Sequence, residues 1–119
     1  MDATTSKTRL DRRGPQARQG LKQKTKNRKD VLRRRMLRQF PKGGTAVEIG
    51  VWRGDFSEII LDELQPSSLT LIDPWLAPDD PEFSSALAAR AGESKMDKIY
   101  GEVRRRFSDR IADGNVRII

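Results

Sequence analysis

The sequence predicts an α/β protein in which three parallel strands and their connecting helices follow a basic N-terminal tail. Three observations predict this class. Basic side chains are concentrated before residue 43. Short apolar runs then alternate with segments of helical periodicity, which is typical of a parallel sheet with helical crossovers. Glycines also flank the first junction between a strand and a helix, where a parallel α/β unit needs a tight turn.

The first 42 residues carry most of the positive charge. They hold fifteen Lys and Arg side chains against three acids, a net +12, whereas the remainder carries −5, which together give +7. Residues 1–29 contain only Met1, Leu10 and Leu21 as large apolar side chains. We expect them to be disordered, because so little apolar surface cannot offset the entropy of ordering. They form either a phosphate-contacting segment or a solvated tail without a partner.

Residues 30–42 are predicted to form an amphipathic helix and a linker. Asp30 can cap the helix, and Leu32, Met36 and Phe40 recur at the spacing of one helical face. The proline and glycines that follow end it near Gln39.

A strand–helix–strand unit follows in under thirty residues. Thr45–Ile49 and Leu69–Ile72 have the composition of short buried strands, and Asp55–Leu64 has an apolar stripe at helical spacing. Asp55 and Glu58 have the spacing of a capping box.

The rest of the chain predicts a second crossover. We expect a loop with a short helix near residues 83–91, then a helix over Met96–Arg110 with Arg104–Arg106 on its solvated face. A third strand begins at Val116 and includes Ile119. Three parallel strands with two crossovers form half of a doubly wound fold, so residues 43–119 are predicted to be an incomplete, partially Rossmann-like domain.

Composition limits the chemistry. The chain has no cysteine and no histidine, which excludes disulfides, thiolate metal sites and a histidine base. No apolar run approaches the roughly 18 residues of a membrane span, and no secretory signal is evident, so a cytoplasmic protein is expected. No metal site is expected, and the catalytic residues are unknown.

The junction after the first strand indicates a nucleotide-like ligand. Gly50 ends the strand and Gly54 begins the helix, and Asp73 lies nineteen residues past Gly54, where an acid can accept ribose hydroxyls. Trp52 occupies the position of the middle glycine in a dinucleotide fingerprint and would crowd a pyrophosphate, which disfavours an NAD-type site. Glu48 would repel phosphate but suits an ammonium group.

These residues resemble a known family. The pattern E-x-G-x-x-x-G at residues 48–54 resembles motif I of class I S-adenosylmethionine (SAM)-dependent methyltransferases. Residues 47–57 followed by 71–75 are similar to the methyltransferase 24, or macrocin O-methyltransferase-like, subgroup. The resemblance covers roughly residues 40–119 and matches only the N-terminal half of such a domain.

The resemblance implies SAM as cofactor and transfer of its methyl group to an unknown acceptor. The backbone of Gly50–Gly54 would line the methionine part, and Glu48 would contact its amino group. Asp73 would bind the ribose, and Pro74 and Trp75 would lie near the adenine. The implied cofactor-binding residues are Glu48, Gly50, Val51, Trp52, Gly54, Asp73, Pro74 and Trp75.

Structural roles remain open for the same residues. Glu48 could be an exposed edge-strand residue, Asp73 could start a turn with Pro74, Trp75 could be a core residue, and Asp55 a helix cap.

Two further expectations follow from the resemblance and the tail. Because strands that would pair beside the first strand lie outside this sequence, we expect the chain alone to be inactive and to self-associate through an open sheet edge. The alternative function is a non-enzymatic, basic nucleic-acid-binding module that uses residues 1–42.

Overall fold

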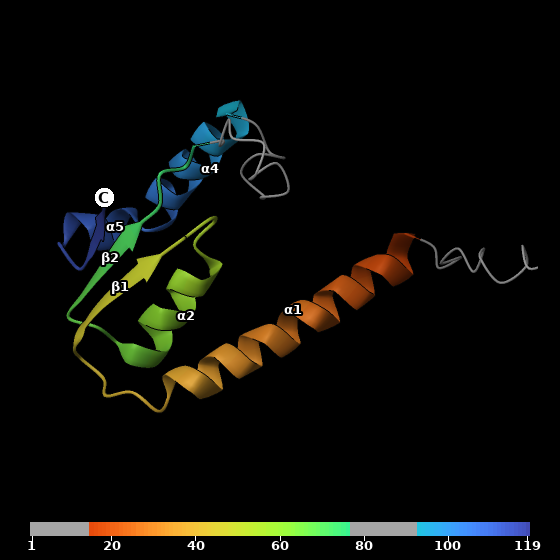
Figure 1. The fold of residues 1–119 in the computed structure, drawn as a ribbon, viewed down its shortest axis with the longest axis horizontal. Coiled ribbons are helices and arrows are strands. Elements are labelled where there is room, and N and C mark those ends of the chain that lie inside the picture. Colours follow the sequence, from red (N-terminus) through yellow and green to blue (C-terminus); the bar gives the residue numbers. More distant parts are fainter. Residues whose placement is uncertain (1–14, 77–92) are drawn as a thin grey trace, which may run out of the picture. The chain divides into compact units, whose positions relative to one another are not determined.

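The computed structural model describes residues 15–76 and 93–119, which form seven elements (Figure 1). These are α1 (Pro15–Leu37), β1 (Thr45–Ile49), α2 (Asp55–Leu64), β2 (Ser68–Ile72), α4 (Glu93–Arg106), α5 (Ser108–Ala112) and β3 (Val116–Ile118). The chain divides into two compact units, one ending at Leu32 and the other running from Arg33 to Ile119, and each is described by itself. None of the described helices is long and apolar enough to cross a bilayer.

The sheet has three parallel strands in the order β1-β2-β3. Ala46 lies opposite Leu69, and Leu69 lies opposite Val116. The predicted three-stranded parallel sheet with flanking helices is therefore confirmed, and each strand lies within one residue of its predicted bounds.

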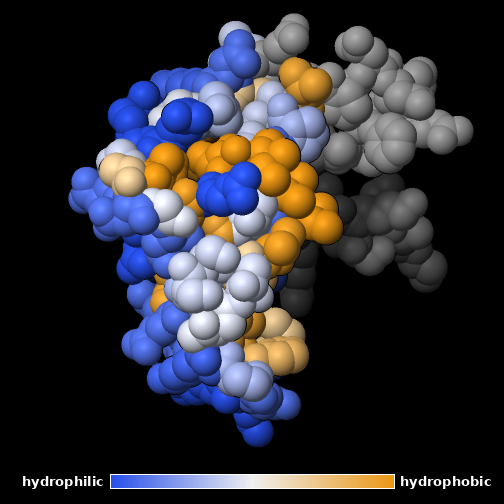
Figure 2. Space-filling model, turned by 90° about the vertical axis from the view of Figure 1, so that its left-hand side faces the viewer, coloured by the Kyte–Doolittle hydropathy of each residue, from blue (hydrophilic) through white to orange (hydrophobic). Residues whose placement is uncertain are grey.

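Among the residues that the structure describes, helices cover one face of this sheet and leave the other uncovered, and we call the uncovered face the bare face. Leu69, Leu71 and Val116 are buried on the covered face in one cluster with apolar side chains of α2 and α4. Glu48 is buried on the same face and accepts a hydrogen bond from Ser57 of α2. The other face carries Val47, 56% exposed, with the half-buried Thr70 and the exposed Arg117 in register with it. Figure 2 shows a contiguous hydrophobic area on one side of the molecule.

The long N-terminal helix differs from the prediction. It begins at Pro15 rather than at Asp30, so the expectation of disorder is wrong for residues 15–29, whereas residues 1–14 lie outside the described part. Apolar burial alone does not decide helix formation, because Lys, Arg and Gln are favourable helix residues and proline is well tolerated in the first turn. A hydrogen bond from Gln23 to Asn27 (3.0 Å) spans one turn of this exposed helix.

The last turns of α1 belong to the second unit and pack on α2. Leu37 is buried, and Arg38 donates two hydrogen bonds to the Glu63 carboxylate (3.0 and 3.1 Å). Arg34 donates a third to the same carboxylate (3.2 Å). The hydrogen bonds from Arg38 and Arg34 hold the pKa of Glu63 below its ordinary value.

The predicted helix over Met96–Arg110 is two helices. α4 ends at Arg106 and α5 starts at Ser108, because Phe107 leaves the helical conformation (φ −109°, ψ 17°) and its side chain is buried. The helix predicted near residues 83–91 lies outside the described residues.

Candidate functional site

The carboxyl ends of β1 and β2 are joined by the side chain of Asp73. Its Oδ2 accepts hydrogen bonds from the backbone N–H groups of Val51 (2.9 Å) and Trp52 (3.1 Å), and its Oδ1 accepts one from Trp75 N–H (2.8 Å). A single carboxylate thus fixes the turn after β1 and the first residues after β2. Bonds to an ionised acceptor are stronger than neutral ones, so this link stabilises both segments.

Trp75 completes the link. Its indole N–H donates to the carbonyl of Trp52 (3.0 Å). The centroids of the Trp75 and Tyr100 rings lie 5.1 Å apart, and the two ring planes are tilted against each other. Trp75 is 4% exposed, so it is a core residue as well as a neighbour of the turn. Both tryptophans have positive φ angles, 59° at Trp52 and 44° at Trp75, a region that bulky side chains rarely adopt. Such backbone strain persists where surrounding contacts impose it, and it is concentrated at functional sites.

Two glycines give the turn its shape for different reasons. Gly50 (φ 84°) has open space where a Cβ would stand. Gly54 (φ 86°) is the N-cap of α2, and a Cβ there would lie 2.7 Å from Cε2 of Phe107. Gly50 is therefore required only by the backbone conformation, whereas Gly54 is also required by the packing of Phe107.

The predicted capping box is not formed. Gly54 occupies the N-cap without a side-chain cap, and Asp55 and Glu58 lie in the first turn, where Arg106 binds both. Arg106 donates to Glu58 (2.7 Å), to Asp55 (2.8 Å) and to the carbonyl of Arg53 (3.0 Å). Arg106 is exposed, as predicted for this face, but its guanidinium also links the end of α4 to the start of α2. The hydrogen bond from Arg106 also lowers the pKa of Glu58.

Glu48 lies beneath the turn rather than on an exposed strand edge. It is 6% exposed, and one of its carboxylate oxygens accepts a hydrogen bond from the buried hydroxyl of Ser57. Burial raises the pKa of Glu48, while the hydrogen bond from Ser57 and the positive charge of Arg33 act in the opposite direction.

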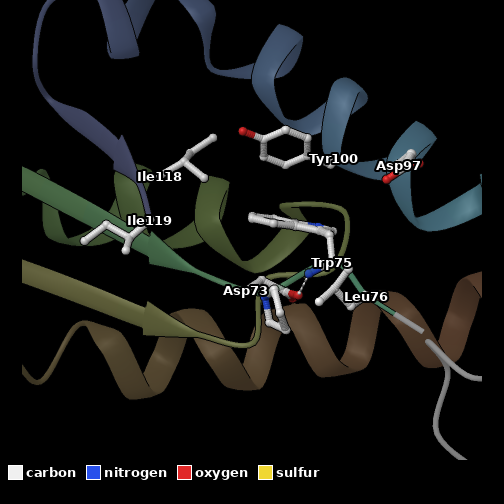
Figure 3. Close-up of a pocket in the computed structure, with 8 residues that line it drawn as sticks. Asp73, Trp75, Leu76, Asp97, Tyr100, Ile118 and Ile119 are labelled. Atoms are coloured by element: carbon white, nitrogen blue, oxygen red, sulfur yellow. Dashed lines mark hydrogen bonds between the residues drawn. The ribbon is translucent and has the colours of Figure 1, made fainter. Parts of the chain in front are cut away.

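A hollow of about 410 Å³, the Asp73 hollow, lies at the carboxyl ends of β2 and β3 (Figure 3). Its lining residues are Asp73, Pro74, Trp75, Leu76, Asp97, Tyr100, Ile118 and Ile119. Figure 3 shows the Tyr100 ring above the Trp75 indole and Asp97 one turn away on α4. The volume falls in the range of small-molecule sites, and apolar walls with a few acids are typical of such sites.

A second hollow of about 330 Å³, the Glu48 hollow, lies at the turn itself. Its lining residues are Arg33, Glu48, Gly50, Val51, Trp52, Arg53, Asp55 and Phe56. The guanidinium of Arg33 stacks 5.0 Å from the centre of the Phe56 ring. Acidic and basic side chains thus lie together around one small volume, a combination that suits a zwitterionic group.

The structure distributes the predicted site residues over the two hollows. Asp73, Pro74 and Trp75 line one, and Glu48 and Gly50 to Trp52 line the other. Gly54 lines neither of them.

Three parts of the linings were not predicted from the sequence, namely Asp97, Arg33 and the end of β3. The end of β3 was predictable from the rule that ligands bind at the carboxyl ends of parallel strands. Asp97 and Arg33 gave no signal, since a charged helix position is most often a solvated one.

Comparisons with protein-family models, with curated proteins and with solved structures give no match to this chain. The class that the described residues define is a small α/β protein with a parallel sheet and two hollows at the carboxyl ends of its strands.

The two glycines of the turn provide a matched pair for a stability measurement. We expect Gly50→Ala to lower the free energy of unfolding by about 1–2 kcal/mol, the cost of a left-handed conformation for an L-residue. Gly54→Ala should lose about 1–3 kcal/mol more, because its Cβ overlaps Phe107. Urea unfolding at one fixed protein concentration measures both. Equal losses would contradict the packing role of Gly54.

Glu48 predicts a distinctive dependence of stability on pH. The folded state retains the Glu48 proton more tightly than the unfolded chain, so wild-type stability falls as the pH rises from the ordinary glutamate pKa through the raised folded-state pKa. Glu48→Gln cannot ionise and should gain stability relative to wild type across that window, measured by urea unfolding from about pH 4 to pH 8.

Glu63→Gln is the control, because the stability contribution of Glu63 depends on pH in the opposite direction to that of Glu48. The pKa of Glu63 is lowered, so its contribution is present at neutral pH and is lost as the pH falls through the folded-state pKa. Glu63→Gln should therefore be less stable than wild type at neutral pH and approach it in acid. A stability difference between Glu48→Gln and wild type that stays constant with pH would show that Glu48 is not perturbed.

Proposed function

We propose that this chain is the SAM-binding half of a class I methyltransferase with a partially Rossmann-like sheet. The observation that carries the proposal is the turn from Gly50 to Gly54, which lies at the carboxyl end of β1 and is joined by Asp73 to the end of β2. One hollow lies at this turn, and the other lies at the carboxyl ends of β2 and β3. This position at the strand ends is where open α/β sheets bind nucleotides and related ligands. The resemblance of residues 47–57 and 71–75 to the methyltransferase 24-like subgroup supports the same ligand.

The methionine part of SAM fits the Glu48 hollow. Glu48 offers an acceptor for the ammonium group, and a cationic ligand beside it would favour the ionised carboxylate over the neutral form that burial favours. Arg33 and Arg53 line the same volume and offer positive charge for the methionine carboxylate. The zwitterionic methionine part of SAM would thus lie beside both an acidic and a basic side chain.

The adenosine part fits the Asp73 hollow. The carboxylate of Asp73 has about four acceptor positions and three are occupied by backbone N–H groups, so one remains for a ribose hydroxyl. Asp97, on the opposite wall, offers a second acceptor for the ribose or for the adenine amino group. Tyr100, Ile118 and Ile119 supply the apolar walls that a planar base requires.

The chemistry is attack of an acceptor nucleophile on the sulfonium methyl, with S-adenosylhomocysteine as leaving group. The residues named here bind and orient the cofactor, and alignment of the reacting atoms is the contribution that a protein makes to such a transfer.

A second candidate function is polyanion binding by α1. This helix carries nine Lys and Arg residues and one acid in 23 residues, and the basic side chains between Arg18 and Lys29 are exposed. Such a helix is about 35 Å long at the standard rise per residue. A positively charged rod without aromatic side chains contacts phosphates rather than bases, so it supports non-specific nucleic-acid binding.

SAM and S-adenosylhomocysteine provide the first test. We expect the full chain to bind both in calorimetric titrations and not to bind NAD. Asp73→Ala should weaken both ligands by about 1.5–3 kcal/mol, roughly ten- to a hundred-fold, because it loses a ribose contact and the link that shapes the turn. Asp109→Ala, an exposed acid of α5, is the control. Unchanged affinity in Asp73→Ala, or weakening for SAM alone, would contradict this site.

Salt dependence tests the second candidate. We expect the chain to bind single- and double-stranded DNA of different sequences alike, and the affinity to fall steeply as salt is raised, because phosphate neutralisation releases counterions. Replacing Lys22, Lys24, Lys26 and Lys29 by Gln should reduce the slope of log affinity against log salt, measured by fluorescence anisotropy. Affinity that is insensitive to salt, or strong discrimination between sequences, would contradict phosphate contact by α1.

A further inference from the structure

The outer edge of β1 presents unused backbone hydrogen-bonding groups. β1 is the first strand in the order β1-β2-β3, and in the described part of the chain no strand pairs with its other side. Gly50 N–H donates to Ile72 O, toward β2. Because backbone groups alternate along a strand, Ala46 and Glu48 also point toward β2, whereas Thr45, Val47 and Ile49 direct their N–H and C=O groups outward.

This edge lacks the features that usually protect a strand edge. The outward residues of β1 are a threonine and two apolar residues, with no charge and no proline among them. Val47 is 56% and Ile49 is 81% exposed. The opposite edge differs, because β3 carries the exposed Arg117. Charged side chains discourage pairing, so within the described residues β1 is the edge that is better suited to adding a strand.

We propose that β1 pairs antiparallel with β1 of a second copy of this chain, which gives a continuous six-stranded sheet. The sequence of β1 is self-complementary under a two-fold axis through Val47. In that register Val47 lies opposite Val47 of the second copy and exchanges two backbone hydrogen bonds with it, and Thr45 lies opposite Ile49. The pairs across the junction are apolar or threonine-containing, and such pairs stabilise antiparallel strands.

Electrostatics favour this arrangement over contact between the bare faces of two sheets, which are the faces that carry Val47, Thr70 and Arg117. In the six-stranded sheet the two Arg117 residues lie five strand spacings apart, about 24 Å, beyond the Debye length at physiological salt. Stacking two bare faces at about 10 Å would instead enclose Arg117 in an apolar layer, since it projects from the same face as Val47 and Thr70. The edge contact desolvates no charge.

The mass of the full chain in solution tests the proposal. We expect sedimentation equilibrium to show a dimer, and Val47→Pro to weaken it at least about tenfold, because the substitution removes both hydrogen bonds at the axis. The N–H of Val47 points away from β2, so the substitution breaks no β1–β2 bond. Thr70→Lys is the matched control, since Thr70 lies on the same bare face but in the central strand. It should leave the dimer unchanged.

A charge exchange at the axis tests the register and does not depend on proline. Val47→Lys and Val47→Glu place like charges opposite each other and should each be monomeric, and their mixture should form a dimer. Circular dichroism checks that each variant is folded. A monomeric wild type, a folded Val47→Pro that remains dimeric, or a mixture of the charged variants that stays monomeric would each overturn the proposal. Dissociation by Thr70→Lys would also overturn it, because the contact would then involve the bare face.

Discussion

The convergence of three backbone N–H groups on the Asp73 carboxylate is the constraint on which the candidate site depends. Two donors come from the turn after β1 and one from the segment after β2. With these ends fixed, the Trp75 indole can reach the carbonyl of Trp52 while its ring packs against Tyr100. The positive φ angles of both tryptophans are sustained by these contacts, and strain of about 1–3 kcal/mol each needs such support. Because both hollows border this linked segment, their shapes depend on the same carboxylate.

The strands and α2 were predictable from the sequence because their apolar periodicity is local information. The presence of Gly50, Gly54 and Asp73 at the strand ends was also predictable, because it can be recognised from the order of residues in the sequence alone. The partners of Asp73 were not, because three N–H groups converge on it only after the turn closes. The break at Phe107 was not predictable for the same reason, because it depends on a tertiary contact. The helical sequence pattern continues through Phe107, but the burial of its side chain beside Gly54 interrupts the helix. The start of α1 at Pro15 and not at Asp30 has a different cause. The intrinsic helix propensity of residues such as Lys, Arg and Gln favours a helix even where no apolar side chains are buried.

The bare face and the open edge have one topological origin. Right-handed crossovers between strands that are added in a single direction place every connecting helix on the same face of the sheet. α2 and α4 therefore both pack on the face that carries Leu69 and Leu71, and nothing in the described residues covers the face that carries Val47. The first strand remains at one edge for the same reason. Within residues 15–76 and 93–119, the outer side of β1 therefore has no strand partner, whatever its side chains are.

Ligand binding and self-association use different surfaces of β1, so a substitution at one surface leaves the groups of the other in place. The hollows open at the carboxyl ends of the strands, and Glu48 faces the helices. The proposed pairing uses the backbone groups of Val47, which point sideways out of the sheet. An added strand along that edge stabilises β1, and β1 leads directly into the turn that Asp73 fixes. The physical coupling between the two surfaces is thus the rigidity of β1, because ordering this strand lowers the entropy cost of closing the turn at its end.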